Sequence, residues 1–301
     1  MENTLKNRMI FIVLCASGML FSQTPQFDGE RAFHYLQEQC AFGPRTPGST
    51  GHQQCLDYLV STVGKFADLT MTQQFIYSYG SPRQTTTGTN IIARFQPQKK
   101  DRILLCAHWD TRPWADEDPD PANHNKPVLG ANDGASGVAV LLHLAELFRK
   151  QPPAPGIDIL FFDAEDAGDH YQEHTWALGS EAFAREYARS FNPRYAILLD
   201  MIGDADLNIS QERYSVIYAR SLVDKIWNKA GELGIYEFNT DVGYAVYDDH
   251  IPLLRAGILC VDIIDFNYQY WHTIHDTPEN CSAASLQKVG QVLTAVVYDE
   301  K

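Results

Sequence analysis

The sequence predicts an α/β fold in which helices cover both faces of a central sheet. Short apolar runs alternate along the chain with longer segments of helical spacing. The chain has 301 residues, of which 45% are hydrophobic and 21% charged, so it holds ample apolar material for a core. No internal repeat, low-complexity tract or long linker interrupts the alternation. We therefore expect a single domain from about residue 28 to residue 301.

The first residues, 1–22, are expected to be a cleaved signal peptide. Lys6 and Arg8 precede an apolar run of roughly 13 residues, which is short for a bilayer core of about 30 Å. The expected cut follows Ser22, and a cut elsewhere or an uncleaved anchor stays open. We expect the mature protein to be secreted or periplasmic, without stable insertion into a membrane.

Five short apolar runs are expected to be strands. Their continuous apolar character is typical of strands that are buried on both faces of a sheet. They are NIIARF (90–95), RILLCAH (102–108), IDILFFD (157–163), YAILLDMIG (195–203) and ILCVDII (258–264).

Three longer segments between these runs have the spacing of amphipathic helices. The spacing predicts helices over residues 135–150, 180–191 and 221–234. The shared apolar face of the first consists of Val138, Leu141, Leu142, Ala145 and Phe148.

The charge of the chain narrows the classes of partner. The formal net charge is -14 at pH 7, and the isoelectric point is near 5.0. A nucleic-acid-binding protein usually carries a basic face that neutralises phosphates. We therefore expect no nucleic-acid partner, whereas a soluble enzyme and a soluble binding protein both fit.

Of the six cysteines, five follow the expected signal peptide, which is an odd number for an oxidising compartment. Cys40 and Cys55 could close a loop through a disulfide. Cys106 and Cys260 lie inside expected strands and are expected to be small core residues. No CxxC pair is present, which argues against a zinc site built from thiolates.

Acids and histidines follow several of the expected strands, at the edge where ligands of α/β sheets usually bind. These side chains supply nitrogen and oxygen donors without a thiolate, which is typical of a catalytic zinc site. Each has an ordinary alternative, such as a backbone-bonded His108, a helix-capping Asp133 or a strand-ending Asp200. The set is His108, Asp133, Glu165, Asp166, Asp200 and His272.

The ordered motifs AHWD, GANDGASG, FFDAED, LLDMIG, DDHIPLLRAG and YWHT resemble those of the zinc aminopeptidase superfamily, and within it the glutaminyl cyclases (glutaminyl-peptide cyclotransferases). The resemblance extends from about Asn90 to the C-terminal helix. The first acid of DDHIP and the tryptophan of YWHT point to the cyclase branch. The resemblance implies a single domain with a mixed sheet, one zinc ion, and substrates that are peptides or proteins with an N-terminal glutamine.

The resemblance implies that Asp133, Asp166 and His272 are the ligands of the zinc ion. This sequence departs from the animal cyclases, which carry Glu where Asp166 stands here. The shorter side chain requires the loop to approach the metal more closely, or the site to bind zinc differently. His108 is a possible ligand of a second metal ion, or a neighbour of the ligands.

The resemblance also assigns the proton-transfer groups. Glu165 would be the general base and acid, and Asp200 and Asp248 would form a hydrogen-bonded acid pair beside it. The remaining acids of the stretch ILFFDAEDAGDH, Asp163 and Asp169, are expected to face solvent or to support the ligands.

Trp271 precedes the histidine ligand and is expected to form an apolar wall for the glutamine side chain, or else to support the His272 loop by packing. Trp176 or Tyr171 is a further candidate for a pocket aromatic.

Two alternatives to a cyclase stay open. A two-zinc aminopeptidase would use His108 and Asp200 for the second ion, with Asp133 bridging both ions. A receptor-like domain without catalysis is disfavoured, because the ligand set and Glu165 are intact.

Overall fold

The structure, a computed structural model, describes residues 24–301 and has the expected α/β fold. The predicted signal peptide lies outside the described residues. Six strands form one sheet in the order β1-β2-β4-β3-β5-β8. The sheet is mixed, because β1, β2 and β4 pair antiparallel whereas β4, β3, β5 and β8 run parallel. The strands are β1 (Leu69–Tyr79), β2 (Gln84–Phe95), β3 (Arg102–His108), β4 (Gly156–Phe162), β5 (Ala196–Asp200) and β8 (Cys260–Ile264).

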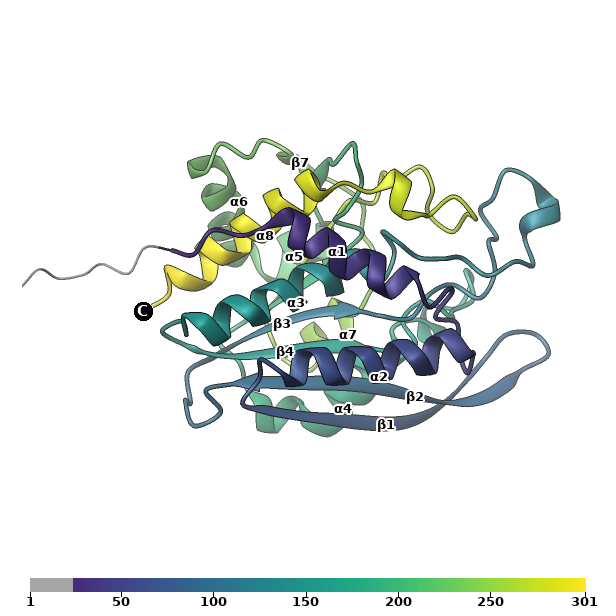
Figure 1. Ribbon diagram of the computed structural model, residues 1–301, viewed down its shortest axis with the longest axis horizontal. Coiled ribbons are helices and arrows are strands. Elements are labelled where there is room, and N and C mark those ends of the chain that lie inside the picture. Colours follow the sequence, from purple (N-terminus) through teal and green to yellow (C-terminus); the bar gives the residue numbers. More distant parts are fainter. Residues whose placement is uncertain (1–23) are drawn as a thin grey trace, which may run out of the picture.

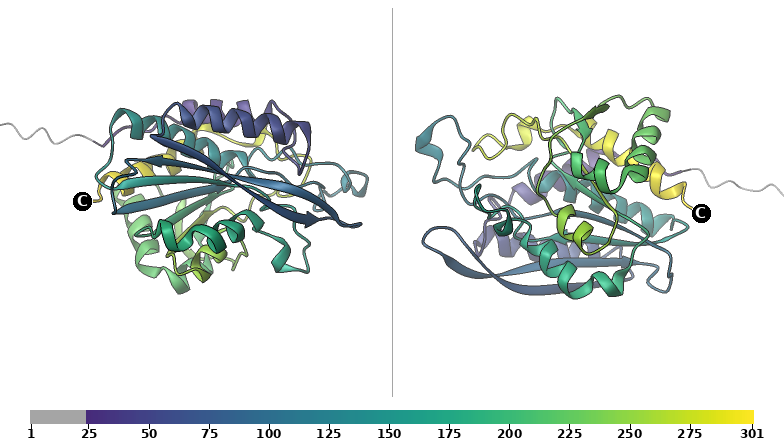
Figure 2. Two further views of the ribbon diagram at one scale, coloured as in Figure 1. Left: turned by 90° about the horizontal axis from the view of Figure 1, so that it is seen from below. Right: turned by 180° about the vertical axis from the view of Figure 1, so that it is seen from behind.

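Helices cover both faces of this sheet (Figures 1 and 2). On one face lie α2, α3 and α8, and α1 packs over α3 and α8. On the other face, α4 packs against the β1–β2 hairpin, and α5 and α7 pack against β8. The helices are α1 (Gly29–Cys40), α2 (Thr50–Gly64), α3 (Ala135–Lys150), α4 (Leu178–Phe191), α5 (Arg213–Tyr218), α6 (Arg220–Glu232), α7 (His250–Arg255) and α8 (Ala283–Tyr298).

The short elements fill the connections between these helices and strands. A separate parallel pair of strands lies near α6. The pair is β6 (Ile209–Gln211) and β7 (Phe238–Val242), and the short 3-10 helices are η1 (Pro121–Asn123), η2 (Glu173–Thr175) and η3 (Pro278–Asn280).

The core explains why the central strands are apolar throughout. Along β3, Ile103 and Leu105 join the hydrophobic cluster beneath α3, whereas Leu104 and Cys106 join the cluster beneath α4. Side chains of a strand alternate between the two faces of a sheet, so both faces of β3 are buried. Helix α3 lies between the sheet and α1, and all of its residues from Ala135 to Phe148 are buried.

The cysteines of the described residues are all buried and free. Cys40 and Cys55 therefore do not close a loop in this structure. Cys106 and Cys260 pack in the core beneath α4, as expected. Between residues 24 and 301, no helix combines the length and apolar character needed to cross a bilayer.

Candidate active site

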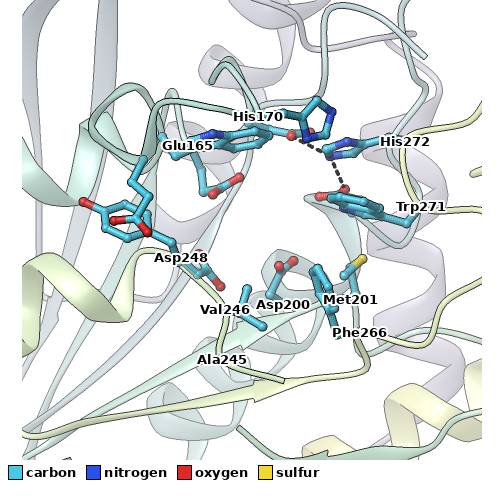
Figure 3. A pocket seen from close by; sticks show the side chains of 15 residues that line it. Glu165, His170, Asp200, Met201, Ala245, Val246, Asp248, Phe266, Trp271 and His272 are labelled. Carbon is cyan, nitrogen blue, oxygen red and sulfur yellow. Dashed lines mark ion pairs between the residues drawn. The ribbon is translucent and has the colours of Figure 1, made fainter. Parts of the chain in front are cut away.

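The acids and histidines that follow separate strands meet at one pocket of about 240 Å³ (Figure 3). Residues that follow β3, β4, β5 and β8 reach this edge of the sheet because those strands run parallel. In Figure 3 the carboxylates of Glu165, Asp200 and Asp248 point into the pocket. The sequence-predicted residues that line it are Asp133, Glu165, Asp166, Trp176, Asp200, Asp248, Trp271 and His272.

Asp133, Asp166 and His272 form a group of ligand atoms that fits a divalent metal ion. One donor atom from each residue lies within 4.8 Å of the others. His272 Nε2 lies 2.9 Å from Asp166 Oδ1 and 3.6 Å from Asp133 Oδ2. Both carboxylate oxygens of Asp166 are buried without a hydrogen-bond partner among the described residues. Buried carboxylates this close repel one another, so a cation between them would stabilise the arrangement.

The electrostatics of this group agree with a metal site. Burial and the neighbouring Asp133 raise the pKa of Asp166 well above its usual range. Burial, together with the charge of Arg112, lowers the pKa of His272 to about 3. The imidazole of His272 is therefore neutral at physiological pH, the form in which histidine binds metals.

His108 belongs to a second group of ligand atoms, with Asp133 and Asp200. Its Nε2 lies 3.1 Å from Asp133 Oδ1 and 3.1 Å from Asp200 Oδ1. Burial opposes a charge on His108, but Asp200 and the other nearby aspartates raise its pKa well above the usual value. His108 is not bonded to backbone, because its Nε2 contacts carboxylates and its Nδ1 has no hydrogen-bond partner among the described residues. Asp133 does not cap α3 either, because the helix begins at Ala135 with Gly134 as its N-cap and has no side-chain cap.

Asp110 holds the loop after β4 in place. Its two carboxylate oxygens accept the backbone N–H groups of Glu165 at 3.1 Å and of Asp166 at 3.2 Å. Gly134 lets the loop before α3 lie close to the Asp110 backbone, because an added Cβ would be only 2.5 Å from the Asp110 carbonyl oxygen. Its φ of 105° is also a conformation that favours glycine.

Asp276 holds the Asp133 loop in the same way. It accepts the backbone N–H groups of Asn132 at 2.8 Å and Asp133 at 3.0 Å, and the Tyr268 hydroxyl at 2.9 Å. Burial and the charge of Asp133 raise the pKa of Asp276 to about 7. Sequence reasoning assigned no role to Asp110 or Asp276, although Asp110 lies two residues after His108 in AHWD.

Of the two alternatives predicted for Asp163, facing solvent or supporting the ligands, burial excludes the first. It is fully buried, and its Oδ1 lies 2.9 Å from His52 Nε2. It also accepts the backbone N–H groups of Thr89 at 2.6 Å and Ala164 at 2.8 Å. Asp163 thus supports the turn that leads into Glu165, whereas Asp169 is exposed.

Three non-glycine residues beside the pocket have left-handed backbone conformations. The φ angles are 60° at Ala164, 45° at Met201 and 53° at His272. Such conformations cost on the order of 1 to 3 kcal/mol each and persist where packing and hydrogen bonds enforce them. Ala164 follows β4 and directly precedes Glu165, and Met201 follows β5 and Asp200. His272 follows β8 and is itself a site residue.

Two tryptophans lie beside the imidazole of His272. Trp271 stacks on it with a centroid distance of 3.9 Å, and Trp176 lies nearly parallel at 6.0 Å. Trp271 therefore packs on His272 and also lines the pocket. Tyr171, the other candidate, is 96% exposed and does not line the pocket.

Glu165, Asp200 and Asp248 bring three buried acids into one pocket. Burial and Asp248 raise the pKa of Glu165 well above the usual value. Burial and Asp200 raise the pKa of Asp248 to about 7. No hydrogen bond joins Asp200 to Asp248 among the described residues, and Asp200 Oδ1 lies 3.1 Å from His108 Nε2. The expected acid pair is therefore close in space but is not directly bonded.

The chain matches the model of peptidase family M28 over residues 90–297. The glutaminyl cyclase of Tannerella forsythia is 40% identical with a TM-score of 0.88, and the match covers 92% of this chain and 100% of that chain. The glutaminyl cyclase of Bacteroides thetaiotaomicron bound to N-acetylhistamine is 39% identical with a TM-score of 0.89, covering 93% and 100%. A leucine aminopeptidase precursor from Bacteroides thetaiotaomicron is 39% identical with a TM-score of 0.89, covering 93% and 99%.

These similarities confirm the resemblance that the motifs indicated. The names of the neighbours divide between glutaminyl cyclases and exopeptidases, which share this fold. Since the family match covers more than half of the sequence, the chain belongs to peptidase family M28.

Proposed function

We propose that the protein is a zinc-dependent glutaminyl-peptide cyclotransferase. It would convert the N-terminal glutamine of peptides and proteins to pyroglutamate and release ammonia. The observation that carries this proposal is the position of Asp248, which lines the same pocket as Glu165. Asp248 is the acid of DDHIP that points to the cyclase branch. Two structural neighbours with about 40% identity are named as glutaminyl cyclases.

The substrate itself supplies proximity, because the α-amine and the side-chain amide belong to one residue. The amine nitrogen bonds to the amide carbon, the bond from that carbon to the amide nitrogen breaks, and ammonia departs. Glu165 takes a proton from the amine and delivers it to the leaving nitrogen. The reaction is an intramolecular aminolysis and consumes no water.

Asp133, Asp166 and His272 would hold the metal ion in this reaction. A bound zinc ion supplies a Lewis acid that polarises the amide carbonyl. The family is zinc-dependent, and the unpaired oxygens of Asp166 fit such an ion. Trp271 and Trp176 would pack on the methylenes of the glutamine side chain and exclude water.

Asp248 would act in its protonated form. Its raised pKa of about 7 means that it keeps its proton at neutral pH to a large extent. A protonated carboxyl donates a hydrogen bond, either to the reacting nitrogen or to Glu165. Asp200 would be the charged partner in this scheme: burial raises its pKa, whereas the charge and the hydrogen bond of His108 favour its ionised form.

The second candidate function is a two-zinc aminopeptidase, which one observation favours. His108, Asp133 and Asp200 form a second complete group of three ligands beside the first. Peptide hydrolysis needs an activated water, which two metal ions commonly provide. One close structural neighbour is named as a leucine aminopeptidase precursor.

Mass spectrometry of a short peptide with an N-terminal glutamine separates the two functions. The purified protein is incubated with zinc and the peptide. Loss of one ammonia with the chain intact would support the cyclotransferase. Release of free glutamine and a shortened peptide would overturn it in favour of the aminopeptidase.

A further inference from the structure

A second cavity of about 530 Å³ lies beside the active-site pocket, at the surface between α5 and α7. Three tyrosines and several aliphatic side chains form most of its wall. We call it the tyrosine groove, and its principal residues are Tyr214, Tyr218, Tyr247, Ile251, Leu254 and Leu259.

Large apolar side chains of the tyrosine groove are open to solvent. Tyr218 is 59% exposed and Leu259 is 46% exposed. The rings of Tyr214 and Tyr218 lie with their centroids 6.4 Å apart and nearly parallel, so they form one aromatic surface on α5. Clustered exposed apolar side chains are typical of surfaces that bind a ligand or partner.

Arg255 fixes the wall that separates the groove from the active site. Its Nη1 donates a hydrogen bond of 2.9 Å to the Tyr247 hydroxyl, and its guanidinium lies 5.2 Å from the centre of the Tyr247 ring. Both of these contacts of Arg255 are therefore to Tyr247.

The tyrosine groove adjoins the active-site pocket. Tyr247 and Glu173 line both cavities, and Tyr247 directly precedes Asp248. The other large neighbouring cavity meets the pocket at His170, and its lining mixes charged residues such as Arg112 and Asp116 with the aromatic residues Tyr79 and Trp114. Fewer charged residues line the tyrosine groove, so it is the more apolar of the two surfaces for a side chain that leaves the pocket.

We propose that the tyrosine groove binds a large apolar or aromatic side chain in the first two residues that follow the N-terminal glutamine. This inference rests on the proposed function, because the occupant is the remainder of the glutamine peptide. An aromatic side chain would stack on the tyrosine rings and cover Leu259, whereas glycine would leave these surfaces in water.

The test compares two pairs of amidated peptides that begin with glutamine. One pair carries phenylalanine or glycine at the second position, and the other carries them at the third. We expect kcat/KM for pyroglutamate formation to be about tenfold higher with phenylalanine in at least one pair, the size typical of partial apolar burial. Tyr218→Ala should reduce this ratio to below about threefold.

Ile217→Ala is the matched control. Ile217 is also 59% exposed and lies on α5, but it does not line the groove. This variant should keep the wild-type ratio. Leu259→Ala provides a second groove variant, which should lower the ratio even if Tyr218→Ala is unstable.

The outcomes of this test separate a failure of the groove proposal from a failure of the proposed function. Equal rates for phenylalanine and glycine, or an unchanged ratio in both groove variants, would overturn the groove while cyclisation persists. Absence of pyroglutamate from every peptide would overturn the proposed function, and the groove proposal with it.

Discussion

The carboxylate of Asp110 accepts the backbone N–H of Glu165 at 3.1 Å. Its other oxygen accepts the N–H of Asp166 at 3.2 Å. One fully buried side chain that follows β3 therefore positions both the proposed proton-transfer group and a proposed metal ligand, which follow β4. The two strands are adjacent and parallel, so their ends remain in register.

Asp110→Asn should weaken this support without removing any group that reacts. An asparagine amide has one acceptor oxygen, so one of the two backbone N–H groups would lose its partner. We expect kcat/KM to fall about 10- to 100-fold, as is common for residues that orient metal ligands. Steady-state kinetics and zinc titration measure this effect. Asp57→Asn, an exposed change on α2, is the control, and equal activity of the two variants would contradict the role.

The proposed single zinc ion predicts a defined metal content. Wild-type protein should hold about one zinc per chain by elemental analysis. His272→Ala should lose most of this metal, because it removes a ligand, and chelation should abolish activity. His108→Ala should still hold about one zinc. Two zinc ions in the wild type, falling to one in His108→Ala, would instead indicate the two-metal site.

The central strands could be predicted because their burial has a simple sequence signature. Both faces of β3 are covered, so Leu104 and Leu105 are equally apolar although they point in opposite directions. The β1–β2 hairpin lacks this signature. Its first strand alternates in burial, and residues 84–87 are polar and largely exposed, so their structure depends on pairing with β1.

Site residues could be predicted where they directly follow a strand. They could not be predicted where their role is to bind backbone N–H groups that are distant in sequence. Glu165 and Asp200 are recognisable from their places after apolar runs. Asp110 and Asp276 act by accepting N–H groups from loops that lie 55 or more residues away in sequence. The tyrosine groove also escaped prediction, because it forms only when α5 and α7 meet in the folded chain.

Glu165→Gln should abolish cyclisation while leaving the metal site intact. The substitution preserves shape but removes the group that moves the proton, so we expect kcat to fall about 10²- to 10⁴-fold. Zinc content should stay at the wild-type value, because Glu165 is not a proposed ligand. Single-turnover kinetics and elemental analysis on the same preparation check both statements. A variant that keeps near-wild-type kcat would remove Glu165 from the mechanism.

Asp248→Asn should change the pH dependence of cyclisation. The raised pKa of Asp248, about 7, means that its proton is present below that pH and lost above it. If the protonated form donates a hydrogen bond, wild-type kcat should decline above about pH 7. Asparagine is a permanent donor, so this decline should be absent from the variant, whose maximal rate should be lower. Superimposable pH profiles of kcat would argue against the role of Asp248.

Glu146→Gln should lower the stability of the protein in a pH-dependent way. Burial opposes the charge of Glu146, but hydrogen bonds from Tyr35 and from Arg31, whose Nε lies 2.8 Å away, hold the pKa of Glu146 below its usual value. A lowered folded-state pKa stabilises the protein above the unfolded-state pKa of about 4.3, and this contribution is lost as pH falls through the folded-state value.

The free energy of unfolding of Glu146→Gln should be lower than that of the wild type by about 1 to 2 kcal/mol at pH 7, allowing for the partial exposure of Arg31. In urea titrations the difference from wild type should shrink as pH falls below the unfolded-state pKa of about 4.3, and the exposed control Glu30→Gln should change stability by less than about 0.5 kcal/mol. A constant difference across this pH range would mean that packing, not charge, gives Glu146 its effect.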